Sequence, residues 1–121
     1  IDLAEQFRPI AGALNLTASG FDDIGGEAFD LVINATAASL SAAAPAIPDT
    51  VYAPGALAYD MMYGAEPTTF LLAARAAGAR RVADGLGMLA EQAAESFLIW
   101  RGVRPDTAAV LATLRAALAK G

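Results

Sequence analysis

The sequence DGLGMLAEQAAESF, residues 84–97, decides how the rest of the chain is arranged, because it begins as a loop and continues as a helix. Asp84 is suited to cap this helix, since its carboxylate can accept hydrogen bonds from the unpaired amides of the first turn. Gly85 and Gly87 leave that turn with little side-chain bulk. Such a helix start lets another group approach the backbone N–H donors and the positive end of the helix dipole.

The helical spacing of residues 85–100 sets one uncharged amide among apolar side chains. At 100° per residue an apolar arc forms, while two glutamates lie opposite; the arc is Leu86, Leu89, Ala90, Ala93, Ala94, Phe97 and Trp100, and the glutamates are Glu91 and Glu95. Gln92 lies at the arc's edge, where it must find hydrogen-bond partners or cost about 1–3 kcal/mol. The pattern leaves two interpretations open: a bond to a nearby loop carbonyl, or a contact with a ligand.

Segments before this helix predict a parallel sheet. The sequence FDLVIN at residues 29–34 is the best strand, and its continuous Leu-Val-Ile triplet is typical of a strand covered on both faces. Residues 56–61 and 81–83 are further strand candidates, and residues 14–17 indicate a short edge strand. Helical spacing over residues 68–77 completes an alternation of strands and helices, which is the pattern of an α/β fold. Thr36 then follows the first strand, where open α/β sheets bind ligands.

The remaining segments predict helices at both ends and a loop between. Residues 1–10 have the pattern of the end of an amphipathic helix, and residues 39–54 are a proline-rich loop with at most a short helix. Asp106 is placed to cap a last helix, whose apolar face carries Val110, Leu111, Leu114 and Leu118. The chain starts at Ile1 with helix already in progress, so we expect it to be cut from something longer.

Composition excludes several classes of function. The 121 residues are enough for one modest domain, and the net charge of −5, with scattered basic residues, argues against nucleic acid or an anionic membrane surface as partner. Cysteine and histidine are both absent, which removes disulfides, the common zinc ligands and the commonest general base, so we expect no metal site. The longest uncharged run, residues 31–48, is a poor membrane span, and no signal peptide is visible.

Three motifs in order resemble those of the shikimate dehydrogenase family. DLVINAT at residues 30–36 resembles the family's D-L-[IV]-I-N-A-T, and YDMMYG at 59–64 with TTFL at 68–71 resembles Y-D-M-x-Y…T-P-F-L. DGLGML at 84–89 with QAA at 92–94 resembles D-G-L-G-M-L…Q-A-A, and WRGVRP at 100–105 resembles W-x-G-x-x-P. The similarity therefore runs over nearly the whole chain.

This resemblance implies the C-terminal part of an NADP-dependent shikimate 5-dehydrogenase, a cytoplasmic enzyme of aromatic amino-acid biosynthesis. Such enzymes reduce 3-dehydroshikimate to shikimate by hydride transfer. The implied fold is a partial Rossmann-like, doubly wound α/β domain, with about three parallel strands, flanking helices and a C-terminal helical pair. Residues 1–121 would be the C-terminal part of the NADP-binding domain, and the N-terminal catalytic domain and glycine-rich turn would be absent.

The resemblance also implies roles for six residues. Contacts with the cofactor are implied for Thr36, Met61, Gly85 and Met88, and contacts with the substrate for Tyr63 and Gln92. A phenol and an amide offer donors and acceptors for a polyol, and a methionine offers soft bulk against a flat ring. Two departures are visible: Ala37, Ala38 and Ser39 stand where serines and glycine are frequent, and Thr69 replaces the usual proline.

No residue of this chain matches the family's catalytic lysine and aspartate, which lie in its N-terminal domain. The one lysine is Lys120, so we assign no catalytic role to Asp60, Asp84 or Lys120 and expect the fragment alone to be inactive. Two alternatives stay open: a quinate/shikimate dehydrogenase, or a non-catalytic binding module. A cut domain would expose an uncovered sheet edge and helix face, so we expect self-association for either origin. The sequence does not specify whether the substrate is shikimate or quinate, or whether the cofactor is NADP or NAD.

Overall fold

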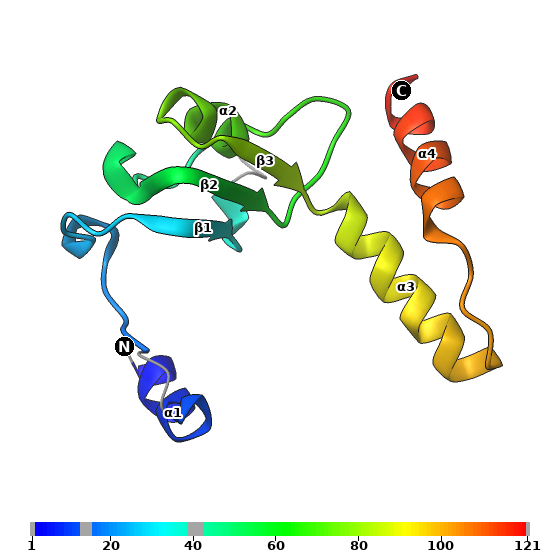
Figure 1. Cartoon of the computed structure of the whole chain (residues 1–121), viewed down its shortest axis with the longest axis horizontal. Helices are drawn as coiled ribbons and strands as arrows, with labels where there is room; N and C mark the ends of the chain where they lie inside the picture. The colour runs from blue at the N-terminus through cyan, green and yellow to red at the C-terminus, as the bar shows by residue number, and fades with distance from the viewer. Residues whose placement is uncertain (1, 13–15, 39–42, 121) are drawn as a thin grey trace.

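The computed structural model describes residues 2–12, 16–38 and 43–120, and at its centre lies a three-stranded parallel sheet (Figure 1). Its strands are β1 (Phe29–Asn34), β2 (Tyr52–Asp60) and β3 (Arg81–Asp84), in the spatial order β1-β2-β3. The register pairs Asn34 with Asp60 and Asp60 with Asp84, so all three strands end at the same level. The carboxyl ends therefore form one even edge.

The described helices precede, connect and follow these strands in the chain. They are α1 (Asp2–Ala11), the short 3-10 helices η1 (Phe21–Asp23) and η3 (Asp49–Val51), then α2 (Thr69–Ala76), α3 (Leu86–Arg101) and α4 (Thr107–Leu118). Figure 1 shows α3 leaving the end of β3 and projecting away from the sheet, with α4 returning beside it. The predicted α/β class, with three parallel strands and a C-terminal helical pair, is confirmed. Within the described ranges, no helix is long and apolar enough to span a membrane.

Capping residues mark where these helices begin and end. The Thr68 hydroxyl accepts the Leu71 amide at 3.3 Å at the start of α2, and the Asp106 carboxylate accepts the Ala108 amide at 2.9 Å at the start of α4. At the end of α3, Gly102 adopts the left-handed conformation at φ 72°, which terminates the helix. The predicted helices at residues 68–77 and after Asp106 are thus confirmed.

The main core lies between the sheet and α2. Its buried residues are Ala58, Phe70, Leu71, Ala74 and Ala79, with Val32, Ile47, Tyr52 and Val82 packed around them. Alanines on β2 and α2 let the helix approach the sheet closely, and Phe70 fills the remaining space. The core is therefore small and covers one face of the sheet.

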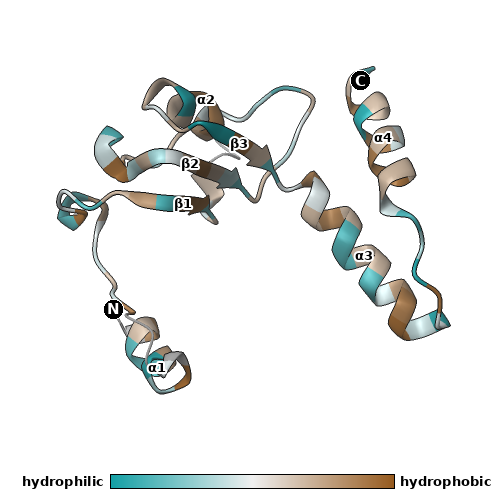
Figure 2. Cartoon of the chain, in the orientation of Figure 1, coloured by the Kyte–Doolittle hydropathy of each residue, from teal (hydrophilic) through white to brown (hydrophobic). Residues whose placement is uncertain are grey.

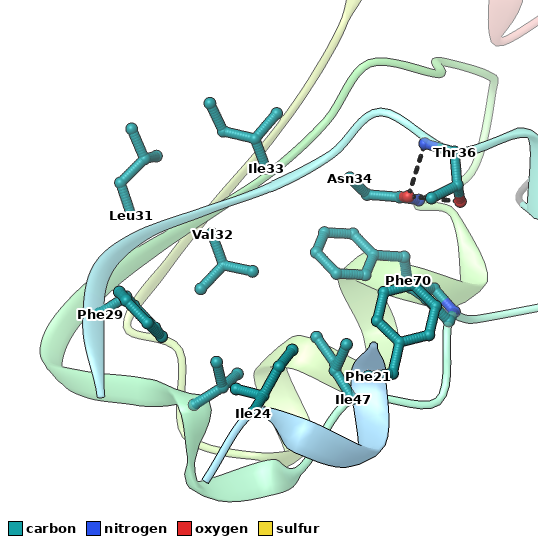
Figure 3. Close-up of a pocket in the computed structure, with 12 residues that line it drawn as sticks. Phe21, Ile24, Phe29, Leu31, Val32, Ile33, Asn34, Thr36, Ile47 and Phe70 are labelled. Carbon is teal, nitrogen blue, oxygen red and sulfur yellow. Dashed lines mark hydrogen bonds between the residues drawn. The ribbon is translucent and has the colours of Figure 1, made fainter. Parts of the chain in front are cut away.

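The prediction that β1 is covered on both faces is wrong. Leu31 is 51% exposed and Ile33 is 55% exposed, and Figure 3 shows both side chains pointing away from Val32 and Phe70. Helix α2 packs on the Val32 face, and among the described elements the opposite face of β1 has no comparable cover. The apolar triplet correctly located the strand, but its burial depends on parts of a fold that a local pattern does not specify.

Strand β2 begins earlier than predicted, at Tyr52 rather than at residue 56, and it ends at Asp60. Two steps along β1, from Phe29 to Leu31, face five steps along β2, from Tyr52 to Leu57. The extra residues form an irregularity that contains Gly55 at φ 89°. This is why the strand's first half has the sequence of a loop.

The predicted edge strand at residues 14–17 falls partly outside the described residues. Leu16 and Thr17, which are described, lie in no strand. Of the predicted loop at residues 39–54, positions 39–42 lie outside the described part, and η3 is the short helix that the prediction allowed. The last residues of that range belong to β2 instead.

Candidate functional site

The three strands end in the same local structure. At each end, a side-chain oxygen accepts the backbone N–H two residues later: Asn34 Oδ1 from Thr36 at 3.1 Å, Asp60 Oδ1 from Met62 at 3.0 Å, and Asp84 Oδ1 from Leu86 at 3.2 Å. Such bonds turn the chain sharply as it leaves a strand. The carboxyl edge of the sheet is therefore built from three similar turns side by side.

Backbone hydrogen bonds join these turns to one another. The Met61 N–H donates to the Asn34 carbonyl at 3.0 Å, and the Gly85 N–H donates to the Met62 carbonyl at 3.1 Å. A Cβ on Gly85 would lie 2.0 Å from the Met61 carbonyl oxygen, so only glycine fits at this buried position. A Cβ on Gly87 would meet nothing within 4 Å. Of the two glycines singled out in the sequence, Gly85 is required by the close approach of Met61, just after β2, and Gly87 is not.

Asp84 ends β3 and is held by a distant helix. The residue that caps α3 is Gly85, but the Asp84 carboxylate does accept an amide of the first turn, as predicted. Arg115 of α4 binds both carboxylate oxygens, with Nη1 to Oδ2 at 2.6 Å and Nη2 on Oδ1. Burial raises the pKa of Asp84, but the hydrogen bonds from Arg115 and Leu86 and the Arg115 charge outweigh it and lower the pKa overall.

Three of the predicted cofactor residues come together at this edge. Thr36, Met61 and Gly85 follow the ends of β1, β2 and β3 respectively. The Thr36 hydroxyl donates to Asn34 Oδ1 at 2.7 Å (Figure 3), and Met61 is 41% exposed. Met88 lies one turn into α3 and is 38% exposed. This arrangement leaves uncharged soft and polar side chains accessible beside the ends of the strands.

The two predicted substrate residues lie on different elements. Tyr63, in the loop after β2, is 41% exposed and lines an apolar cavity of 530 Å³ between the loop, α3 and α4. Gln92 is exposed on α3, so the packing-boundary interpretation of its position does not hold. At seven residues from Gly85 it lies on the same side of the helix as Gly85. Whether these side chains contact a ligand stays a prediction.

Helix α3 is buried at its start and exposed at its far end. Leu86, Ala90 and Ala94 are buried, whereas Trp100 is 78% exposed, so the predicted apolar arc faces the protein over its first turns only. Figure 2 shows hydrophobic residues at the end of α3 that is distant from the sheet. The helix therefore carries a large apolar surface away from the core.

A group of polar side chains joins α3 to the start of α4. The exposed carboxylates of Glu91 and Glu95 both bind Arg104, with 2.7 Å between Arg104 Nη2 and Glu91 Oε2, and the Thr107 hydroxyl donates to Glu91 at 2.7 Å. The Thr107 hydrogen bond, followed by Arg104, lowers the pKa of Glu91. The prediction that both glutamates face solvent is confirmed, and they also hold the helical pair together.

An apolar cavity of 260 Å³ lies beside β1, on the α2 side of the sheet (Figure 3). Phe21, Val32 and Phe70 line it, and Asn34 and Thr36 lie at its end. In the part of the chain that the structure describes, no cluster of three acidic residues could hold a metal ion.

Comparison with known proteins shows which proteins the chain resembles. The family model of the shikimate 5'-dehydrogenase C-terminal domain matches residues 85–115. A protein of Aromatoleum aromaticum named shikimate dehydrogenase (NADP(+)) is 63% identical over 119 residues, which cover 98% of this chain and 43% of that protein. A protein of Bordetella avium with the same name is 62% identical over 109 residues, covering 90% of this chain and 38% of that protein. This chain is similar to the C-terminal part of shikimate dehydrogenases.

The chain spans about two fifths of the length of these shikimate dehydrogenases. Two solved structures resemble it in sequence and in fold. The crystal structure of an Ael1 enzyme from Pseudomonas putida is 49% identical with a TM-score of 0.80, over 92% of this chain and 41% of that one. The ligand-free 5-ketofructose reductase of Gluconobacter sp. strain CHM43 is 33% identical with a TM-score of 0.63, over 73% of this chain and 32% of that one.

The motifs that resemble shikimate dehydrogenases each span the end of one strand. Residues 30–36 cross the end of β1, residues 59–64 the end of β2, and residues 84–89 the junction of β3 and α3. The three motifs are distant in the chain, and the fold brings them to one edge of the sheet. This is the place where ligands bind in open α/β sheets.

Two structural side chains of this edge were not identified from the sequence. Asp60, which is fully buried, accepts a hydrogen bond from the Thr68 hydroxyl at 2.6 Å, and Arg115 binds Asp84. The first could have been found, because an Asp or Asn ends each strand and a threonine precedes the next helix. The Arg115 contact spans 31 residues and has no local signal.

Proposed function

We propose that this chain is the C-terminal part of an NADP-dependent shikimate dehydrogenase that reduces 3-dehydroshikimate to shikimate in the cytoplasm. The observation that supports this most directly is the convergence of the three motifs on the carboxyl edge of the sheet. Residues 1–121 would then be the C-terminal part of a Rossmann-like NADP-binding domain, with the catalytic lysine and aspartate elsewhere in the full protein. The chain alone would be inactive.

Within this proposal, the strand ends hold the nicotinamide end of the cofactor. Thr36, Met61 and Met88 present exposed side chains around the buried Gly85 turn. All four residues are uncharged, which suits contact with the uncharged ring of the reduced nicotinamide. NADPH, when bound, supplies the hydride. The residues of this chain orient the ring and keep water from one of its faces, which is a positioning contribution to catalysis.

The substrate side of the proposal rests on Tyr63 and Gln92. The Tyr63 hydroxyl can donate one hydrogen bond and accept another. The Gln92 amide donates through its NH₂ group and accepts through its oxygen, which suits the adjacent hydroxyls of shikimate. Tyr63 is half exposed beside the start of α3, and Gln92 is exposed two turns along that helix. In this proposal the two residues approach the substrate from neighbouring elements.

Assays of the full-length protein with shikimate or quinate, each paired with NADP or NAD, test the proposal. We expect the highest kcat/KM with shikimate and NADP; preference for quinate would identify a quinate/shikimate dehydrogenase instead. Losing one ligand hydrogen bond costs about 1 kcal/mol, so Gln92→Ala and Tyr63→Phe should each raise the shikimate KM about fivefold. Tyr52→Phe is the matched control, because it also removes a tyrosine hydroxyl, but at the opposite end of β2 from Tyr63. Unchanged kinetics in both site variants would refute the site assignment.

The exposed face of β1 supports a second proposal, that the chain self-associates when it is separated from its parent protein. Leu31 and Ile33 present adjacent apolar side chains that are each half exposed. Sedimentation equilibrium should show a mass above one chain that rises with concentration, and Ile33→Lys should reduce it. Leu72→Lys, on the exposed side of α2, is the control. A monomeric wild-type chain would contradict this proposal.

A further inference from the structure

Helix α4 reaches back to the end of β3 through one side chain. Arg115 places both terminal nitrogens on the Asp84 carboxylate, with Nη1 2.6 Å from Oδ2 and Nη2 on Oδ1. Two parallel bonds of this kind fix the carboxylate in orientation as well as in position. The Asp84 side chain is 13% exposed and that of Arg115 is 48% exposed, so the pair lies at the surface with its acidic half largely covered.

The same carboxylate controls the turn that contains Gly85. Asp84 Oδ1, which receives Arg115 Nη2, also accepts the Leu86 amide at 3.2 Å. The Gly85 amide in turn donates to the Met62 carbonyl at 3.1 Å. The short backbone of residues 84–86 therefore links the bond from α4 to the bond that joins Gly85 to the loop after β2.

The other two strand ends are held differently. The Asn34 side chain is bound by the Thr36 hydroxyl at 2.7 Å, two residues away, and the Asp60 side chain by the Thr68 hydroxyl at 2.6 Å, eight residues away. Both of these threonine partners lie close in sequence to the residue that they bind. At β3 the corresponding partner is 31 residues away on another helix. Helix α4 therefore binds directly to the carboxylate that accepts the Leu86 amide of the Gly85 turn.

We propose that Arg115 is a positioning residue for the nicotinamide end of the cofactor. It acts through Asp84: by holding that carboxylate it sets the place of the Gly85 turn against Met61, and with it one wall of the cofactor site. The inference rests on the proposed function, because it assigns a purpose to a contact at the proposed site.

Kinetics of the full-length protein test this role, with Arg104 as the matched control. Arg104, in the connection between α3 and α4, also binds two carboxylate oxygens, but they belong to Glu91 and Glu95 of α3 and not to Asp84. Because misplacing a reacting ring by a fraction of an ångström slows hydride transfer, Arg115→Ala should lower kcat about tenfold with less than about a twofold change in the NADPH KM. The deuterium isotope effect on kcat, measured with NADPH labelled at the transferred hydrogen, should increase. Arg115→Lys should restore part of kcat, and Arg104→Ala should leave kcat and the isotope effect unchanged.

Hydrogen exchange gives a readout that does not depend on activity. The Leu86 amide should exchange faster in Arg115→Ala than in wild type or Arg104→Ala, because its acceptor is no longer held. Unchanged Leu86 exchange, or equal losses of kcat in the Arg115→Ala and Arg104→Ala variants, would overturn the positioning role. Failure of the proposed function has a different result from failure of the positioning role. The wild-type protein would then show no turnover of shikimate with NADP, while the difference in Leu86 exchange between the variants would persist.

Discussion

Replacing Gly85 with alanine should destabilise the junction of β3 and α3, because the added methyl group has no room. Its carbon would lie 2.0 Å from the Met61 carbonyl oxygen and 2.7 Å from the carbonyl carbon. Both are backbone atoms, so no side-chain rotation relieves the overlap. The torsions of Gly85, φ −74° and ψ −4°, are accessible to alanine, so the cost comes from the contact and not from the backbone conformation.

The magnitude follows from how far the two segments would have to separate. Moving from 2.0 Å to an ordinary contact of 3.4 Å requires about 1.4 Å of movement, which overpacked sites do not achieve without backbone shifts. That movement would break the Gly85 N–H to Met62 bond, now 3.1 Å, at a cost of about 1 kcal/mol. With about 1–3 kcal/mol for overpacking, we expect a loss of about 2–4 kcal/mol in the free energy of unfolding.

Gly87→Ala is the matched control, two residues further along the chain. Its added carbon meets nothing within 4 Å, and glycine to alanine inside a helix stabilises by about 1 kcal/mol, so the two variants should differ in sign. Urea unfolding of the full-length protein, monitored by circular dichroism, measures both. A Gly85→Ala protein that unfolds at the same urea concentration as wild type would refute the close approach of Gly85 and Met61.

Three further predictions concern the same edge. Thr68→Ala should lower the free energy of unfolding by about 2–3 kcal/mol, because the hydroxyl both caps α2 and binds the buried Asp60, whereas Thr68→Ser should cost less than about 1 kcal/mol; urea unfolding compares them. The pKa of Asp84 lies below its ordinary value since, although burial raises it, bonding to Arg115 outweighs burial. Its contribution to stability is therefore complete above about pH 4 and lost as the pH falls through the lower folded pKa, so the difference in urea midpoint between wild type and Asp84→Asn should shrink on acidification, and a constant difference would contradict the ion pair. Met61→Ala, at a 41% exposed side chain, should cost less than about 1 kcal/mol of stability yet raise the NADPH KM several-fold in steady-state assays; an unchanged KM would remove Met61 from the cofactor site.

The order and type of the main elements could be predicted because their signals are local. Strand β1 occupies the predicted residues 29–34, since an apolar triplet ends at Asn34, whose side chain turns the chain. The helices after Thr68 and Asp106 begin where those side chains cap them. The parallel arrangement then follows from the alternation of strands and helices.

Two features of the fold could not be predicted, because they depend on distant contacts. The first half of β2 contains Pro54 and Gly55, which normally indicate a loop, and only pairing with β1 makes it a strand with an irregular register. The exposed side chains of Leu31 and Ile33 have the pattern of a buried strand. Local sequence specifies that a residue is apolar, but not whether another element covers it.

The candidate site shows how far a motif can be read as evidence for a ligand. Gly85 is the most distinctive residue of its motif, yet the fold itself already requires a glycine there, because Met61 leaves no space for a side chain. Its presence is therefore weak evidence for a cofactor. Met61 is more informative: its own side chain is 41% exposed, so packing explains little of its identity, and the same turn presents it at the edge where the strands end. A substitution at Met61 separates binding from folding, whereas one at Gly85 changes both together.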